Sequence, residues 1–392
     1  MIIKDVKARK ILNSRNQETI EISINSDILN GIGRAPSGAS KSSKEVKDFP
    51  KGVDKAVEFV NNTLSKELVN FSIEEFNDFK KFENLIKKYD KSKDLNIIGG
   101  NTIIALEFAM LNCFKQPWKF LNPEAKNLPR PLGNVIGGGA HIKEGIDYQE
   151  FLLLSLNAKS VKDAVRANNE IYNSVRKRFG LFFNRRNDEG AWAPKDLNET
   201  DILDILSGEA RKFSKKNGFD VKIGIDVAAN HLFNGNYRYK GKELTREEHI
   251  EYVIDLVERY NLIYIEDPVE ENDAKGFKEI TNKVKHRCLV SGDDFIATNP
   301  SLLKKYKDSL NAVIVKPNQI GSLVKMKEVI DFALKSKITP VISHRSGETM
   351  DASIVHLSVG FNVPIIKCGI YGKEREAKLN ILEKIETEIK IK

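Results

Sequence analysis

The stretch AVIVKP, residues 312–317, is a short apolar run rich in β-branched residues that ends on a lysine and a proline. A continuous apolar run of this length is typical of a parallel strand that is buried on both faces. Taken alone, the lysine has an ordinary explanation, in which its stem packs against the strand and its ammonium reaches water. Five further runs of the same kind change that interpretation: VKIGID, LIYIEDP, CLVSGDD, PVISHR and PIIKCG.

Each of the six runs carries an ionisable residue at its carboxyl end. These residues are Asp226, Glu266, Asp293, Lys316, His344 followed by Arg345, and Lys367. The runs recur at intervals near the length of one strand–helix unit of a barrel, roughly 25 to 35 residues, and the segments 245–260 and 322–336 between them have amphipathic helical spacing. Since the carboxyl ends of barrel strands meet on one face, we predict an α/β barrel with these side chains in one shared space.

The chain before residue 128 has a different pattern. Strand-like runs come first, at 6–12 and 19–24, and helical spacing follows at 52–64 and 101–114. This order predicts an α+β module, in which Asn101 is expected to cap the second helix. The segment 123–133 carries three prolines and is the predicted linker. We therefore expect an N-terminal α+β domain at 1–128 and the barrel at 129–392.

Composition limits the classes of function. Hydrophobic residues make up 41% of the 392 residues and charged residues 30%, which is typical of a folded protein. We expect no membrane span and no signal peptide, because no apolar run reaches about 18 residues, and the three isolated cysteines suit a reducing cytoplasm. The net charge of +8 raises the alternative of RNA or an anionic surface as partner. Its lysines are interspersed with acids, however, so nucleic acid is not the expected partner.

Three of the strand ends suggest a metal site. Asp226, Glu266 and Asp293 offer hard oxygen ligands from successive strands, and a carboxylate-only set suits Mg²⁺ or Mn²⁺ better than zinc. Lys316 and Lys367 would lie beside that cation, whose positive potential favours a neutral amine. A neutral lysine facing a metal-bound carboxylate can remove the proton α to it.

These residues resemble those of the enolase family. The resemblance runs from KARKILNSR at residue 7 almost to the last residue. The most specific stretches are IEDP at 265, GDD at 292, KPNQIG at 316 and SHRSGET at 343; supporting ones are PSGAS at 36, NVIGGGAH at 134, YQEF at 148 and NDEGAWAP at 187. The resemblance implies an α/β enolase-type (β/α)₈ barrel that opens with a ββαα unit and carries an N-terminal α+β capping domain. It also implies a Mg²⁺-dependent lyase that interconverts 2-phosphoglycerate and phosphoenolpyruvate in glycolysis.

The resemblance also implies metal and acid–base roles. Asp226, Glu266 and Asp293 would hold a first Mg²⁺, and Ser40 would close over a second that arrives with the substrate. Lys316 would take the substrate's C2 proton. Lys367 would stabilise the charge that develops on the carboxylate. The acid side of the site would consist of Glu189, which protonates the departing hydroxyl, and its partner Glu150, with Glu189 expected to be protonated near neutral pH.

The remaining roles concern substrate binding. Arg345 and Ser346 would bind the phosphate, Arg345 by bidentate hydrogen bonds. His344, His141 and Gln149 would line the pocket, with His141 on a glycine-rich loop that could act as a lid. The family further implies a phosphorylated small molecule as substrate and at least a homodimer.

Departures from the family pattern leave a first alternative open, and the net charge of +8 with the lysine-ended sequence IKIK leaves a second. Asn16 replaces a usual glycine and is expected in a left-handed conformation. The lid after PSGAS reads Lys41-Ser42-Ser43-Lys44 instead of beginning Thr-Gly, and the second lid, 141–144, is poor in glycine. The first alternative is thus an enolase-like paralogue that acts on another phosphorylated 2-substituted acid. The second is a binding role for the basic surface.

Overall fold

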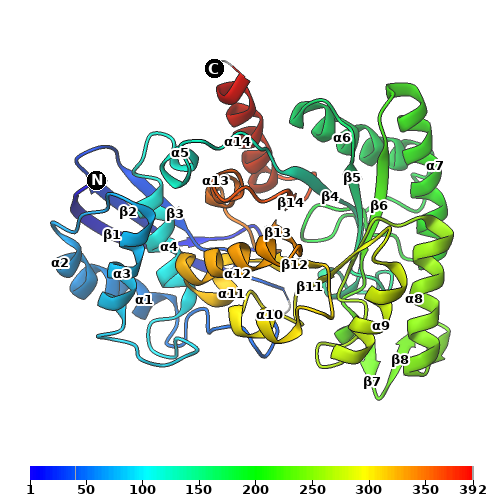
Figure 1. Ribbon diagram of the computed structural model, residues 1–392, viewed down its shortest axis with the longest axis horizontal. Helices are drawn as coiled ribbons and strands as arrows, with labels where there is room; N and C mark the ends of the chain where they lie inside the picture. The colour runs from blue at the N-terminus through cyan, green and yellow to red at the C-terminus, as the bar shows by residue number, and fades with distance from the viewer. Residues whose placement is uncertain (40, 391–392) are drawn as a thin grey trace.

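The computed structural model describes residues 1–39 and 41–390, and it contains two packed units (Figure 1). The N-terminal unit, in blue and cyan, is a small sheet covered by helices. The second unit is a closed eight-stranded barrel surrounded by helices. The predicted fold class, a barrel with an N-terminal α+β domain, is confirmed.

The N-terminal sheet is an antiparallel meander of β1 (Ile3–Leu12), β2 (Glu18–Ser26) and β3 (Gly31–Arg34). Asn16 lies in the β1–β2 turn with φ 58°, the left-handed conformation that its sequence position predicts. The sheet packs against α4 (Gly100–Leu111), whose residues are all buried. The other helices of this unit are α1 (Val53–Phe59), α2 (Ser65–Leu68), α3 (Phe79–Ile86) and α5 (Pro117–Leu121).

The predicted capping role of Asn101 is wrong. Gly99 occupies the N-cap position of α4, and Asn101 is buried inside the first turn. Its side-chain amide donates a hydrogen bond to the carbonyl of Pro36 at 3.0 Å, and its Oδ1 accepts one from Asn318 Nδ2 at 3.1 Å. Asn101 therefore joins Pro36, the first residue of PSGAS, to the barrel, a tertiary contact that local spacing does not reveal.

The barrel opens with the ββαα unit. Strand β5 runs antiparallel to both of its neighbours, and the remaining neighbouring pairs in the barrel are parallel. Around the ring the order is β10-β11-β12-β13-β14-β4-β5-β6. The strands are β4 (Arg130–Gly137), β5 (Glu150–Ser155), β6 (Val221–Asp226), β10 (Tyr264–Glu266), β11 (Leu289–Gly292), β12 (Ala312–Val315), β13 (Thr339–Ser343) and β14 (Ile365–Lys367).

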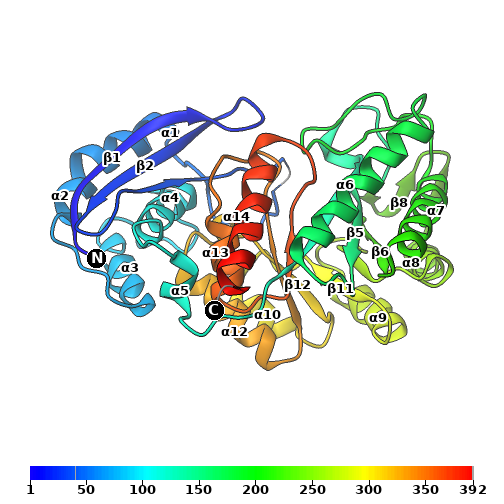
Figure 2. The same cartoon turned by 90° about the horizontal axis from the view of Figure 1, so that it is seen from above.

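The barrel helices follow the strands in chain order. They are α6 (Val161–Arg178), α7 (Glu199–Asn217), α8 (Arg246–Tyr260), α9 (Ala274–Val284), α10 (Pro300–Tyr306), α11 (Pro317–Ile320), α12 (Leu323–Lys335), α13 (Ser353–Gly360) and α14 (Lys373–Lys390). A hairpin sheet of β7 (Phe233–Asn234), β8 (Asn236–Tyr239) and β9 (Lys242–Leu244) is inserted after β6. Seen from above, α14 crosses the middle of the molecule (Figure 2).

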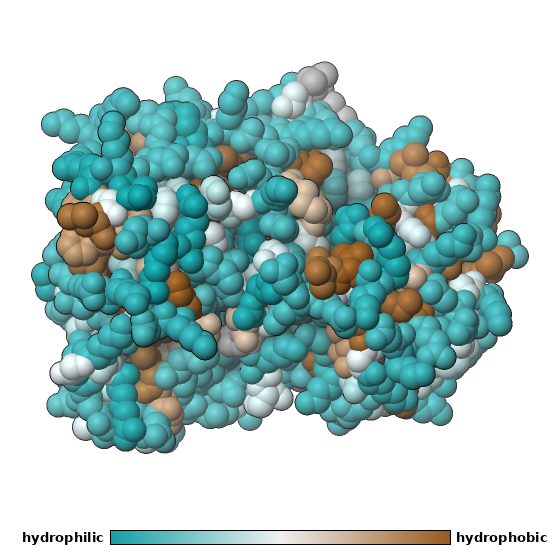
Figure 3. All heavy atoms as spheres, turned by 180° about the vertical axis from the view of Figure 1, so that it is seen from behind, coloured by the Kyte–Doolittle hydropathy of each residue, from teal (hydrophilic) through white to brown (hydrophobic). Residues whose placement is uncertain are grey.

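The described residues contain no helix long and apolar enough to cross a membrane. Seen from behind, the surface is mostly hydrophilic, and its hydrophobic patches are separated from one another (Figure 3). The three cysteines, Cys113, Cys288 and Cys368, are free and buried.

The contact between β3 and α4 yields a stability prediction. A Cβ atom at Gly33 would overlap the backbone of Ala105 and Ala109, whereas one at Gly208 in α7 would meet open space. We expect Gly33→Ala to lower the free energy of unfolding by about 1 to 3 kcal/mol through overpacking. Gly208→Ala should raise it by about 0.5 to 1 kcal/mol through helix propensity. Chemical denaturation of both variants measures the difference, and equal effects would contradict it.

Candidate active site

A cavity opens at the carboxyl ends of the barrel strands. It gathers most of the residues that the sequence predicts for the site, from several strand ends of the barrel and its loops. Those lining it are His141, Gln149, Glu150, Glu189, Asp226, Asp293, Lys316, His344, Arg345, Ser346 and Lys367. The predicted ligand Ser40 lies outside the described residues, although its neighbours Gly38 and Ala39 line the cavity.

Three buried carboxylates lie at the ends of adjacent strands. Asp226 ends β6 and Glu266 ends β10, and these two residues are directly paired in the barrel register. Asp293 follows the last residue of β11, the next strand in the ring. Glu266 does not line the cavity but lies behind it, in contact with Lys367. The parallel register thus produces the acidic row that the strand ends predict.

The ammonium of Lys367, at the end of β14, lies among the carboxylates. Its Nζ is 2.8 Å from Glu266 Oε2, 3.0 Å from Asp226 Oδ2 and 3.1 Å from Glu150 Oε2. Burial would lower the pKa of Lys367, but the surrounding carboxylates, with Asp226 first, raise it well above its usual value. Lys367 is therefore charged among these residues and compensates part of the buried negative charge; the neutral amine expected beside a bound metal stays a prediction.

The carboxylate row also fits a divalent cation. Glu266 Oε1 is buried and accepts no hydrogen bond. Burial and the adjacent carboxylate of Asp226 raise the pKa of Glu266 to about 8. The positive charge of Lys367 therefore does not fully compensate the negative charge of the carboxylate row. An oxygen-only donor set with an unsatisfied buried oxygen suits Mg²⁺. Among the described residues, the ligand atoms of two other groups converge within 4.8 Å of one another, which those of the row do not: His141 with Glu150 and Glu189, and Asp267 with Asp293 and Asp294.

We assign neither of those groups to the metal. The first contains a histidine that is itself paired with carboxylates. In the second, Asp267 is occupied by hydrogen bonds from the backbone N–H groups of Asp293 and Asp294, at 2.9 and 2.8 Å. Asp267 therefore shapes the turn after β11 and directs the side chain of Asp293.

Lys316, which follows β12, donates from Nζ to Asp293 Oδ2. Burial would lower the pKa of Lys316, but the Asp293 carboxylate outweighs it and the pKa is raised. The protein's own residues therefore produce a protonated lysine, and the expected neutral amine requires a cation on Asp293. The backbone N–H of Lys316 also donates to Thr298 Oγ1 at 2.9 Å, which fixes the start of α11.

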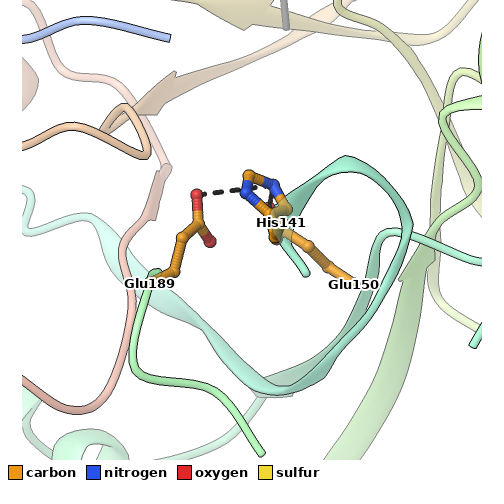
Figure 4. A group of neighbouring side chains, drawn as sticks. All are labelled: His141, Glu150 and Glu189. Carbon is orange, nitrogen blue, oxygen red and sulfur yellow. Dashed lines mark ion pairs between the residues drawn. The ribbon is translucent and has the colours of Figure 1, made fainter. Parts of the chain in front are cut away.

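Across the cavity, His141 lies between two glutamates (Figure 4). His141 Nε2 is 3.7 Å from Glu189 Oε1 and 4.0 Å from Glu150 Oε1, and Nδ1 is 2.9 Å from Asp188 Oδ1. Burial alone would lower the pKa of His141, yet these carboxylates, with Glu189 first, raise it to about 9. His141 is thus an imidazolium at neutral pH.

The two glutamates differ in protonation. Burial raises the pKa of Glu150 well above its usual value, with only partial relief from Lys367. Burial also acts on Glu189, but the nearby imidazolium of His141 outweighs it and lowers the pKa of Glu189. The directions of the two pKa shifts favour a proton on Glu150 over one on Glu189, and the protonated Glu189 that the resemblance implies stays a prediction. His344, whose pKa burial lowers to about 3, is neutral.

The opposite end of the cavity holds the guanidinium of Arg345. Its Nη1 is 3.0 Å from Glu45 Oε2, and burial is outweighed by Glu45, so the pKa of Arg345 is raised. The adjacent Ser346 is held by Arg375 of α14, whose Nη2 donates to the Ser346 carbonyl at 2.7 Å. Lys378 of the same helix pairs with Glu348 at 2.7 Å. Two buried cations of α14 thus support the loop that carries Arg345.

Sequence reasoning missed several of these groups. Asp188, Glu45, Gln319 and Arg375 each contact a predicted site residue. Gln319 lies inside KPNQIG and Asp188 inside NDEGAWAP, so the motifs themselves pointed to both. Glu45 and Arg375 lie in charged helical or loop segments, where an acid or a cation is ordinarily exposed. Gln149 lines the cavity, and its Nε2 donates to Asp226 Oδ2 at 3.3 Å.

Comparison with known proteins identifies similar chains. The model of the family "Enolase, N-terminal domain" matches residues 3–115, and that of "Enolase, C-terminal TIM barrel domain" matches residues 125–392. The enolase of Methanosphaera stadtmanae is 39% identical over 411 positions, covering 99% of this chain and 97% of its own length. The enolases of Methanothermobacter thermautotrophicus and Archaeoglobus fulgidus are 38% and 37% identical, covering 99% and 98% of this chain and 97% of their own lengths.

The raised pKa of His141 predicts a pH dependence of stability. A histidine whose pKa is 6.5 when unfolded and about 9 when folded stabilises the fold fully below pH 6.5 and loses this contribution as the pH rises through 9. We expect wild type in metal-free buffer to lose up to about 3 kcal/mol relative to His141→Gln over this range. Urea unfolding of both proteins at several pH values measures the difference, and parallel curves would contradict it.

Proposed function

Because the chain belongs to the enolase family, we propose that it catalyses the reversible dehydration of 2-phosphoglycerate to phosphoenolpyruvate in the cavity at the barrel mouth. One observation carries the assignment of the site. Lys316 and Glu150 come from β12 and β5, which lie on opposite sides of the eight-stranded ring. A base and an acid that face each other across a substrate suit the removal of a proton from one face and a hydroxyl from the other.

Asp226, Glu266 and Asp293 would hold one Mg²⁺ ion, and a second would be completed by Ser40 when substrate is bound. Bound Mg²⁺ withdraws negative charge from the substrate carboxylate and so makes the neighbouring C–H more acidic. The protein's part is to hold the carboxylates in a row. Lys367 pairs with Asp226 and Glu266 and so keeps these two carboxylates together before the ion enters.

Lys316 would remove the C2 proton in its neutral form. The ion pair with Asp293 keeps Lys316 protonated, and neutralising that carboxylate lowers the lysine pKa toward the working pH. Lys367, held among the carboxylates, would remain charged and bind the substrate carboxylate on which negative charge develops.

The hydroxyl would leave on the side of Glu150, Glu189 and His141. His141 Nε2 lies 3.7 Å from Glu189 Oε1, and one oxygen of Glu150 lies within 4.8 Å of one oxygen of Glu189. A proton passed from either group to Glu189 would be delivered to the hydroxyl, which then departs as water. His344, neutral and 3.7 Å from Glu189 Oε2, would orient this acid. At the other end, Arg345 and Ser346 would bind the phosphate, and Gln149 would hold Asp226 in place.

We also propose that two copies associate as a homodimer. Leu181 is 91% exposed and Leu12 is 61% exposed, and large apolar side chains this accessible favour coverage by another chain. Sedimentation equilibrium should give twice the mass of the chain, and a monomer at micromolar concentration would contradict the proposal. The expected cytoplasmic location stays a prediction.

The ultraviolet absorbance of phosphoenolpyruvate tests the proposed lyase activity directly. Wild type with 2-phosphoglycerate and Mg²⁺ should form phosphoenolpyruvate, and a chelator should abolish the signal reversibly. Lys316→Ala should lose at least about 10²-fold in kcat, the usual contribution of general-base catalysis. Lys335→Ala, an exposed lysine at the end of α12, is the matched control and should retain wild-type rates.

Absence of product from folded, Mg²⁺-loaded wild type would contradict the proposed reaction. Metal-dependent exchange of the α-proton without phosphoenolpyruvate formation would then favour the paralogue that acts on another phosphorylated acid. Salt-sensitive binding to RNA that survives Lys316→Ala would instead favour the binding role of the basic surface.

A further inference from the structure

Glu45 lies where the N-terminal domain meets the phosphate end of the cavity. Its side chain is buried and accepts from both terminal nitrogens of Arg345, at 3.0 Å from Nη1 to Oε2 and 3.2 Å from Nη2 to Oε1. Two parallel hydrogen bonds to one carboxylate fix the plane of a guanidinium. Asn318 Oδ1 accepts a further bond from Nη1 at 3.1 Å.

The same carboxylate is linked to the metal and base side of the cavity. Gln319 Nε2 lies 3.4 Å from Glu45 Oε1 and donates to Asp293 Oδ1 at 2.8 Å. Thr298 Oγ1 donates to Gln319 Oε1 at 2.6 Å, which fixes the orientation of that amide, and accepts from the backbone N–H of Lys316. One hydrogen-bonded chain therefore joins Arg345, Glu45, Gln319 and Asp293.

Glu45 belongs to the lid segment, residues 41–46, which follows PSGAS. The backbone N–H of Val46 donates to the Gln319 carbonyl at 3.0 Å. Lys44 Nζ donates to the carbonyls of Glu271 at 2.7 Å and Phe295 at 3.2 Å, and Ser42 Oγ donates to the Glu271 carboxylate at 2.5 Å. This lid segment is thus attached to the barrel at two places, by Glu45 to Arg345 and by Ser42 and Lys44 to Glu271.

We propose that Glu45 is a positioning residue that orients Arg345 for the substrate phosphate and, through Gln319, aligns Asp293. The proposal rests on the proposed function, since it concerns the phosphorylated substrate of that same site. It makes the lid segment part of substrate recognition, because the carboxylate that sets the phosphate-binding guanidinium is carried by the lid segment and not by the barrel. A residue acting in this way should influence substrate affinity more than the rate of the chemical step.

The first test is the kinetics of Glu45→Gln, which keeps the size of the side chain but removes its charge and one of its two acceptors. We expect the KM for 2-phosphoglycerate to rise about tenfold, equivalent to about 1.4 kcal/mol, with kcat changed by less than about threefold. Glu271→Gln is the matched control, because it weakens the other attachment of the same segment without touching Arg345. Its KM should stay within about twofold of wild type.

Two kinetic results would overturn the proposal. A KM that falls in Glu45→Gln would mean that Glu45 competes with the phosphate for Arg345. Equal increases of KM in both variants would mean that the segment acts only through lid closure. The second measurement does not depend on turnover: inorganic phosphate should raise the Tm of wild type and of Glu271→Gln, and the shift should be largely lost in Glu45→Gln.

The phosphate measurement also distinguishes failure of the proposed lyase reaction from failure of the proposed positioning role of Glu45. If wild type has no lyase activity but phosphate still stabilises it in a Glu45-dependent manner, the proposed reaction fails while the positioning role of Glu45 stands. If activity is present and Glu45→Gln shows the wild-type KM and the wild-type phosphate shift, the reaction stands and the positioning role is excluded.

Discussion

The site depends on one buried ammonium. Lys367 contacts carboxylates from three different strands, and all four side chains are buried. Because a buried ion is costly unless it is paired and hydrogen-bonded, the position of Lys367 determines whether Glu150, Asp226 and Glu266 can be placed together at all. The single charge of Lys367 does not compensate all of the surrounding carboxylates, because the pKa of Glu266 is still raised. Affinity for a divalent cation follows from this incomplete compensation.

The strand ends could be predicted from sequence because barrel geometry converts a linear pattern into a spatial cluster. Each apolar run that ended on an ionisable residue became a strand that delivers it to the mouth, from Asp226 on β6 to Lys367 on β14. Asn16 was predictable for a local reason, since few non-glycine residues other than asparagine or aspartate adopt positive φ readily. These successes share a dependence on backbone periodicity and conformation, which a sequence records directly.

What the sequence could not reveal depends on tertiary burial. Asn101 is of a residue type that often caps helices, but the packing of α4 turns its side chain toward Pro36 and Asn318. Glu45 is one of many acids in lysine-rich segments, and only its distance from Arg345 distinguishes it. The protonation states of Glu150 and Glu189 could not be predicted from the sequence either. Both are buried glutamates, and their pKa values shift in opposite directions because the fold places different charged groups around each. Such differences arise from contacts between segments far apart in the chain.

The pairing of β14 with β4 has a consequence for synthesis of the chain. Ile365 to Lys367 pair with Arg130 to Leu132, so the ring closes between segments separated by most of the barrel's length. The strand that closes it is the one that carries Lys367, and α14 behind it supports the Arg345 loop through Arg375 and Lys378. A ribosome must therefore release nearly the entire polypeptide before the acidic row is neutralised. A nascent chain can fold its N-terminal domain early, but its active-site cavity is complete only after β14 and α14 have been synthesised.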